Sequence, residues 1–310
     1  MGVRSLGNTL ATFRNKFGRT GIEASSSTGG SGLSATGGNQ TSPSGFTAPN
    51  GFKYHVFTSS GSLVVESGTA EAYYLVVAGG GSGGFGNGAG GGAGGLRSND
   101  PTVPSPSSMK VTHTFTLSPG TYPVTVGDGG TSPADNGSES KIGTSTVVAS
   151  GGGYGGNNST GNPGGSGGGG TSGDASSVNS PDPLSPDKQG HAGGNDGNGG
   201  GGGGAGSAAG PNGEGGAKLN ISAYNTTQIN PGISMPTAWK AYVGTNGGYA
   251  GGGYGHDDNP NSHNQAAGST DQGIVNTGGG GDEGPGIDGG KGIVIIRLSL
   301  IHISEPTRPY

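Results

Sequence analysis

Short β-branched or aromatic segments of this chain repeatedly lead directly into runs of glycine. Residues 73–78 (YYLVVA) precede a glycine run that continues to residue 95, and residues 145–150 (STVVAS) precede a second run. The segments 241–244 and 273–277 precede two later runs. Glycine loses more conformational entropy on folding than other residues, so such runs are poor helix or strand interiors. The ordered alternative is the extended polyproline II geometry, here built from glycine, whose backbone groups must bond to neighbouring segments.

The chain has too few apolar residues for a side-chain core of the usual kind. It contains 78 glycines and 19 prolines in 310 residues, and 27% of its residues are hydrophobic. Disordered chains share this composition but are usually highly charged, whereas here charged residues make up 11% and strand-like segments such as 52–57 (FKYHVF) recur. We therefore predict ordered polyglycine helices that pack flank to flank. Collagen is excluded because no strict Gly-X-Y period is kept. Side chains within the runs, such as Ser82 and Phe85, are expected to face outward.

The apolar segments before residue 150 predict short antiparallel β units. Residues 52–57 and 62–66, joined by a turn at 59–61, have the pattern of a hairpin to which 73–78 adds a third strand. A second unit is predicted from 109–117, a turn at 118–120, and 122–126. Further strands are expected within 142–149 and at 291–297. The predicted fold is thus mostly β plus irregular, with short antiparallel β units followed by a bundle of polyglycine II helices with polar loops, and little or no α-helix.

Composition divides the chain into consecutive parts. Residues 1–24 form a basic leader, since four cations and no acid stand in the first twenty positions. Residues 25–45 are rich in serine and glycine, which predicts a flexible linker. Residues 46–150 are expected to form a β-rich base that contains the first glycine run, and residues 151–297 a glycine-rich bundle with variable loops.

The tail at 298–310 differs from everything before it. The sequence LSLIHISEPTRP resembles one reading frame of a common transposase sequencing adapter, which it matches over eleven residues. We interpret residues 298–310 as adapter-derived and exclude them from the fold prediction. The natural chain is then expected to end at or just beyond Arg297.

Several classes of protein are disfavoured by composition. Residues 25–297 contain 9 lysines and arginines against 17 aspartates and glutamates, so we expect no nucleic-acid partner. The chain has no cysteine, so neither disulfides nor thiolate metal sites can form. No apolar stretch approaches 18 residues, and the leader lacks a continuous apolar region, so neither a membrane span nor a secretory signal is expected.

No motif predicts a cofactor, a metal or a catalytic centre. The phosphate-loop pattern GxxxxGK[ST] is absent, and GxGxxG matches within polyglycine arise from composition alone. His256, Asp257 and Asp258, with His263 nearby, are the densest set of polar ligands, and they could bind Ca²⁺, but a solvated loop is the favoured interpretation. We therefore predict a protein that is not an enzyme.

Aromatic residues gather near the same place. They could recognise a sugar or protein at a loop tip, where rigid rings supply contact area at low entropic cost, or they could cover a small apolar patch. Both interpretations stay open. With the polar set, the candidate receptor contacts are Trp239, Tyr242, Tyr249, Tyr254, His256, Asp257, Asp258 and His263.

The order of the segments also resembles a known group. The sequences HVFTSSGSLVV, YYLVVAGGGSGG, TYPVTVGDGG and TSTVVASGGGYGG follow one another, and KGIVIIR closes the series. Over residues 52–297 the chain resembles the glycine-rich domain of tailed-phage fibre and tip proteins. The leader is similar to those of virion proteins in marine phages.

This resemblance implies a structural virion protein, a tail-fibre or tip adhesin that acts outside the cell. Loops between the polyglycine helices would recognise a protein or glycan receptor on the host surface, and residues 1–24 would dock to other tail-fibre proteins. The implied loops are 171–189, 217–240 and 255–272. Two alternatives stay open, a secreted or surface glycine-rich matrix protein of a microbe and a partly disordered low-complexity protein.

Overall fold

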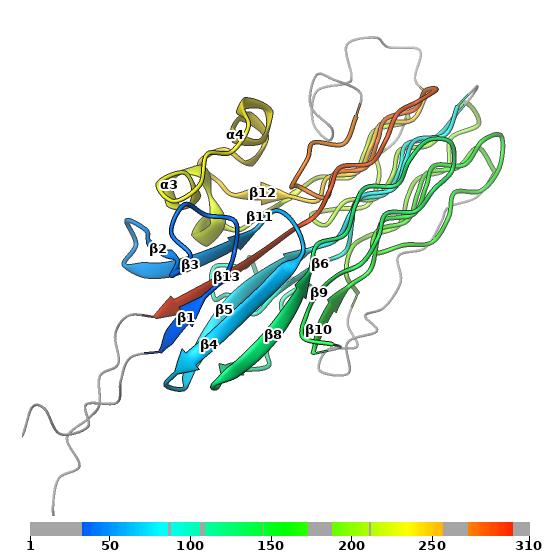
Figure 1. The fold of residues 1–310 in the computed structure, drawn as a ribbon. Helices are drawn as coiled ribbons and strands as arrows, with labels where there is room; N and C mark the ends of the chain where they lie inside the picture. Colours follow the sequence, from blue (N-terminus) through cyan, green and yellow to red (C-terminus); the bar gives the residue numbers. More distant parts are fainter. Residues whose placement is uncertain are drawn as a thin grey trace, which may run out of the picture.

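The structure is a computed structural model, which describes residues 33–85, 88–105, 109–144, 146–172, 188–210, 212–256 and 272–299. Strands gather at one end of the molecule, and glycine-rich segments extend from them toward the other end (Figure 1). We call these the sheet end and the distal end. The helices of the described residues are short, so the predicted fold, mostly β with little α-helix, is confirmed.

A six-stranded central sheet has the order β2-β3-β13-β5-β6, with β7 also paired to β5. All of its strand pairs are antiparallel. Its strands are β2 (Phe46–Thr47), β3 (Phe52–Phe57), β5 (Ala70–Val77), β6 (Leu96–Ser98), β7 (Phe115–Leu117) and β13 (Ile293–Ser299).

A five-stranded outer sheet, in the order β1-β4-β8-β9-β10, covers one face of the central sheet. A helical lobe over residues 219–249 covers the other face. The outer sheet consists of β1 (Ser34–Thr36), β4 (Gly61–Ser67), β8 (Gly120–Thr125), β9 (Ser140–Ile142) and β10 (Val147–Ala149). The lobe consists of β11 (Leu219–Asn220), the 3₁₀ helix η2 (Ser222–Tyr224), α3 (Thr226–Ile229), α4 (Thr237–Val243) and β12 (Gly248–Tyr249).

The last strand in sequence, β13, is central in space. It pairs with β3 on one side and with β5 on the other, as Figure 1 shows. Ile293 and Ile295 pack toward the lobe, whereas Val294, Ile296 and Leu298 pack toward the outer sheet. Because both faces are covered, the first four residues of β13, 293–296, are a continuous apolar run rather than an alternating one.

Both predicted hairpins are wrong. The segment 52–57 forms β3 of the central sheet, but the segment after the turn forms β4 of the outer sheet and pairs with β1 and β8. In the same way β7 joins the central sheet and β8 joins the outer one. Each predicted turn therefore crosses between layers. The predicted strand within 142–149 is a hairpin of β9 and β10.

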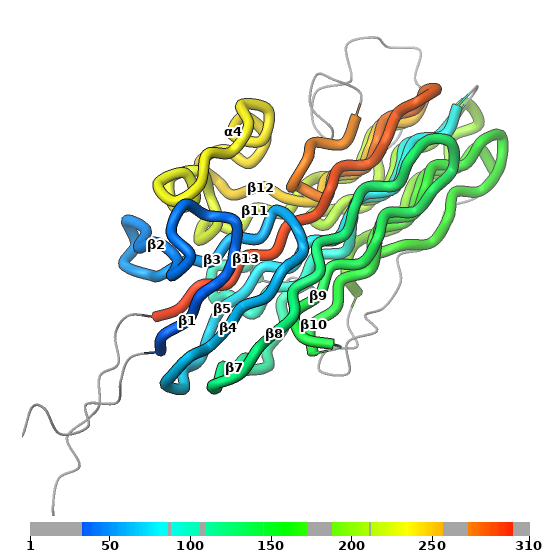
Figure 2. The backbone as a smooth tube through the Cα atoms, viewed as in Figure 1, coloured from blue at the N-terminus to red at the C-terminus, as the bar shows by residue number. Residues whose placement is uncertain are grey.

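Backbone hydrogen bonds of residues 79–84 repeat with a period of three, the repeat of a polyproline II helix. Successive amides donate to three different segments, and then the cycle starts again: Gly79 and Ser82 to 135–138, Gly80 and Gly83 to 287–290, Gly81 and Gly84 to 89–92. Carbonyls of the same run accept from 130, from 152–155 and from 281–284. Six neighbouring segments therefore surround this one, which is hexagonal packing of polyglycine II helices. Figure 2 shows the glycine-rich segments running side by side.

At most glycines of the bundle the neighbouring backbone lies so close that even a Cβ atom would not fit. A Cβ atom on Gly80 would lie 2.0 Å from the carbonyl oxygen of Gly279, and one on Gly151 would lie 1.7 Å from that of Gly137. Ser82 departs from our expectation of an outward side chain. It is fully buried, and its Oγ donates to the carbonyl of Asp135 at 3.2 Å and accepts from its amide at 3.1 Å. Phe85 does face solvent, with 40% of its surface exposed.

The predicted boundaries between parts also need correction. The described portion of the expected linker 25–45 contains β1, and Ala35 is buried, because β1 completes the edge of the outer sheet. The base and bundle are not consecutive either, since β13 belongs to the base and 79–95 to the bundle. Leu298 and Ser299, which we assigned to the adapter, continue β13, and Leu298 is buried. Residues 1–24 and 300–310 lie outside the described residues.

Candidate functional site

Three of the aromatic candidates are buried in or beside the helical lobe. Trp239 donates from Nε1 to the carbonyl of Asn276 at 3.0 Å, and the hydroxyl of Tyr249 donates to the carbonyl of Tyr224 at 2.7 Å. The hydroxyl of Tyr242 accepts from the amide of Gly251 at 2.9 Å. These residues attach the lobe to the start of a glycine segment. They form the apolar patch that was one of our two interpretations, and the prediction that they contact a receptor is wrong for these three.

Tyr254 is also buried, and its amide donates to Asp282 Oδ1 at 2.8 Å. His256 is the one polar candidate that the structure describes, and Nδ1 of its ring lies 3.4 Å from Glu283 Oε1. Asp257, Asp258 and His263 lie outside the described residues. Within the described ranges, no three His, Cys, Asp or Glu side chains come together in a way that could hold a metal ion.

The resemblance implied that the segment 217–240 is a loop between polyglycine helices, but the structure shows otherwise. It folds as most of the helical lobe and packs against the central sheet through a shared apolar cluster. The reason is its apolar content, which includes Ile221, Ile229 and Met235, all buried. Most of the other two implied loops, 171–189 and 255–272, lies outside the described residues.

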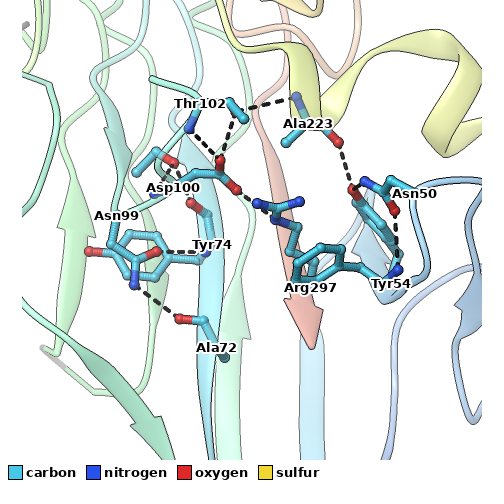
Figure 3. Close-up of polar contacts among 11 residues, drawn as sticks. Asn50, Tyr54, Ala72, Tyr74, Asn99, Asp100, Thr102, Ala223 and Arg297 are labelled. Carbon is cyan, nitrogen blue, oxygen red and sulfur yellow. Dashed lines mark hydrogen bonds and ion pairs between the residues drawn. The ribbon is translucent and has the colours of Figure 1, made fainter. Parts of the chain in front are cut away.

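A buried ion pair joins β13 to the loop after β6. Arg297 Nε lies 2.6 Å from Asp100 Oδ2, and the two side chains are 5% and 0% exposed (Figure 3). The other carboxylate oxygen of Asp100 accepts from the amide of Thr102 at 2.8 Å and from its hydroxyl at 2.7 Å. Aromatic rings of Phe52 and Tyr73 lie 4.1 and 4.9 Å from the guanidinium carbon, within cation–π range.

The electrostatics of this pair favour its charged form. Burial alone would lower the pKa of Arg297, but Tyr224, Asp100 and Tyr54 raise it above its ordinary value. Burial, and next the charge of Asp100, raises the pKa of Tyr224 well above its usual range. The hydroxyl of Tyr54 continues the network and donates to the carbonyl of Ala223 in the lobe at 2.7 Å. Through these contacts the buried cluster joins the lobe to the central sheet.

The distal end presents turns that connect the glycine-rich segments. Its turns bring together parts of the chain that are far apart in sequence: Gly84 accepts from the amide of Gly284 at 2.7 Å, and Gly88 accepts from that of His256 at 3.1 Å. Gly88 also forms a β-bridge with Asn157. The ring of Phe85 and the His256–Glu283 pair therefore stand on neighbouring turns.

The side chains of Phe85, His256 and Glu283 thus stand near turns between closely packed segments of the bundle. Phe85 and Glu283 were not among the candidates from the sequence. A single side chain in a turn between glycine runs has no pattern that distinguishes it from any other turn residue. In the structure Asp282 is buried, whereas Glu283 is partly exposed and faces His256.

Comparison with known proteins gives one family. A family model described as a glycine-rich domain matches residues 57–299. No curated protein and no solved structure matches the chain. Among the helices of the described residues, none has the length and apolar character needed to span a membrane.

Proposed function

Because the chain belongs to the glycine-rich domain family, we propose that it is a non-enzymatic virion protein, a phage tail-fibre or tip adhesin. In this proposal the turns at the distal end recognise a receptor on the surface of a bacterium. The observation that carries the proposal is that the two ends of the molecule are built differently. The first described strand, β1, begins and the last, β13, ends at the tip of the sheet end, and the glycine-rich turns lie at the opposite end (Figure 1).

Such a shape separates attachment from recognition. Residues 1–24 would dock the protein to other tail-fibre proteins from the sheet end, which leaves the distal turns free to meet a cell. The described segments of the bundle that lead into the distal turns are held by backbone bonds on several sides, which would reduce the entropic cost of binding there. Several copies in one particle would raise a weak contact to a useful avidity.

Binding to cells tests the proposal directly. The fluorescently labelled full chain is mixed with a panel of marine bacterial strains, and the cells are sedimented and counted. We expect saturable binding to some strains, which unlabelled protein displaces. A variant in which Glu283 is replaced (Glu283→Ala) should bind more weakly, whereas Lys240→Ala, an exposed change in the lobe, should not. Binding to no strain, or equal binding to all of them, would contradict the proposal.

The genes beside this one give an independent check of the phage assignment. Genes for tail structural proteins on the same contig would support it. A neighbourhood of secretion and matrix genes would instead favour the alternative, a glycine-rich surface protein of a microbe.

A further inference from the structure

The side chains exposed at the distal end are mainly neutral and polar. Asparagine predominates, and its amide can both donate and accept hydrogen bonds. These residues stand on the turns at 157–160, 195–198 and 212, beside the bundle segments that lead to Phe85 and His256. The exposed members are Asn157, Asn158, Ser159, Thr160, Asn195, Asn198 and Asn212.

Phe85 is an exposed ring in the middle of this polar surface. The close packing of Gly88 against Gly84 involves backbone atoms and does not use the Phe85 ring. Of the large hydrophobic residues that the structure describes, only Val64, Phe85 and Val275 are exposed. With 40% of its surface exposed, the Phe85 ring offers an apolar contact surface beside these polar side chains, and a partner that covered it would gain the free energy of its burial.

Charge limits what that partner can be. The described lysines and arginines lie in the sheets, in the lobe or at the sheet end of the bundle, where Lys291 pairs with Asp128 at 3.0 Å. The described distal turns instead carry Asp135, Asp196, Glu214 and Glu283. A phosphate or carboxylate ligand would meet these carboxylates without a guanidinium or ammonium group to bind it.

From this combination we propose that the distal end binds an uncharged saccharide of a cell surface. The apolar C–H face of a sugar ring would stack on Phe85, and its hydroxyls would bond to the amide of Asn157 and the carboxylate of Glu283. Asn157 is next to Gly88 through the β-bridge, and a Cβ on Gly83 would lie 3.3 Å from Glu283 Cα, so both residues flank the Phe85 turn. This inference rests on the proposed function and names its receptor class.

Selective treatment of cells separates the possible receptors. Cells of a strain that binds the full chain are divided into three portions: one untreated, one oxidised with periodate to cleave sugar diols, and one digested with proteinase K. We expect periodate to abolish binding and the proteinase to leave it intact. Because no ion pair is involved, raising NaCl from about 50 to about 500 mM should change the affinity less than twofold.

Two substitutions assign the contact to the distal end. Phe85→Ala should weaken binding about tenfold or more, and Asn157→Ala should weaken it in the same direction. Val64→Ala is the matched control, since it removes an exposed apolar side chain from β4 at the sheet end and should leave binding unchanged. Far-ultraviolet circular dichroism melts of all three variants check that the fold is retained.

The outcomes distinguish this inference from the proposed function. Loss of binding after proteinase but not after periodate would mean a protein receptor, which overturns the saccharide and leaves the adhesin proposal standing. Wild-type affinity in Phe85→Ala, or strong weakening by salt, would also overturn it. Failure of the unmodified chain to bind any strain would contradict both proposals.

Discussion

Gly80 passes Gly279 so closely that a Cβ carbon on Gly80 would lie 2.0 Å from the Gly279 carbonyl oxygen. Contacts of this kind recur through the bundle, where backbone rather than side chain is the neighbour. Glycine is thus required here for the close approach of two backbones, and not for an unusual backbone angle.

The first prediction concerns this contact. Gly80→Ala should lower the free energy of unfolding by about 3 kcal/mol, because the added methyl must push two hydrogen-bonded segments apart. Gly197→Ala is the matched control, since a Cβ there would meet nothing within 4 Å. Urea denaturation followed by circular dichroism measures both. Equal stability of the two variants would show that the bundle is not packed as described.

Amide exchange should report the same packing without a mutation. The amides of Gly80, Gly83 and Gly92 donate to the carbonyls of neighbouring segments within the bundle, so they should exchange far more slowly than the exposed turn at Gly197. Hydrogen–deuterium exchange with mass spectrometry compares the peptides. Random-coil exchange rates across 79–84 and 89–95 would contradict the ordered bundle and remove the support of the distal turns.

The buried ion pair makes a prediction about stability. Arg297→Met should cost about 3–5 kcal/mol, because it leaves the buried carboxylate of Asp100 without its counter-ion. The double variant Arg297→Met with Asp100→Asn should recover part of this loss, since the unpaired charge is then removed as well. Chemical denaturation of the wild type, the single variant and the double variant gives the comparison. A double variant no more stable than the single one would argue against the ion pair as the cause.

His55 predicts a weakening of the fold in acid. Burial, which outweighs the effect of its hydrogen bond to the carbonyl of Gly37, lowers the pKa of this ring, and the charge of Lys53 lowers it further. The unfolded chain, with a histidine pKa of about 6.5, therefore takes up a proton before the folded chain does. The free energy of unfolding should fall below pH about 6.5, by at most about 1.4 kcal/mol per pH unit, until the pH reaches the folded-state pKa.

The test compares wild type with His55→Gln by urea denaturation between pH 7.5 and pH 5. The variant cannot titrate at this position, so it should lose less stability over that interval. An identical pH dependence in both proteins would assign the acid sensitivity to other groups.

The contacts at the end of β13 predict how truncation of the C-terminus affects stability. A chain that ends at Arg297 should be less stable than one that ends at Ser299 by about 2–3 kcal/mol, because it lacks the buried side chain of Leu298 and the final pairs with β3 and β5. Thermal melts of the two chains measure the difference. Equal melting temperatures would favour our original assignment of residues 298 and 299 to the adapter.

Local sequence determined the main strands and the bundle. The apolar segments 52–57, 73–78 and 291–297 are predicted as strands and largely form β3, β5 and β13. A short run of β-branched and aromatic residues bounded by glycine favours a buried strand over a helix. The glycine runs themselves determined that the interior is built from packed backbone, because helices without side chains can approach closely enough for their amides and carbonyls to bond to neighbouring segments.

What only the tertiary structure decided is which segments become neighbours. β3 pairs with β13, which is far from it in sequence. Buried Trp239 donates its indole N–H to the carbonyl of Asn276, also far along the chain. Neither contact can be predicted from local sequence. A turn such as 59–61 has the same composition whether it closes a hairpin or crosses between sheets. The sequence therefore specifies the segments and their lack of side chains, whereas the free energy of the whole packed arrangement selects their partners.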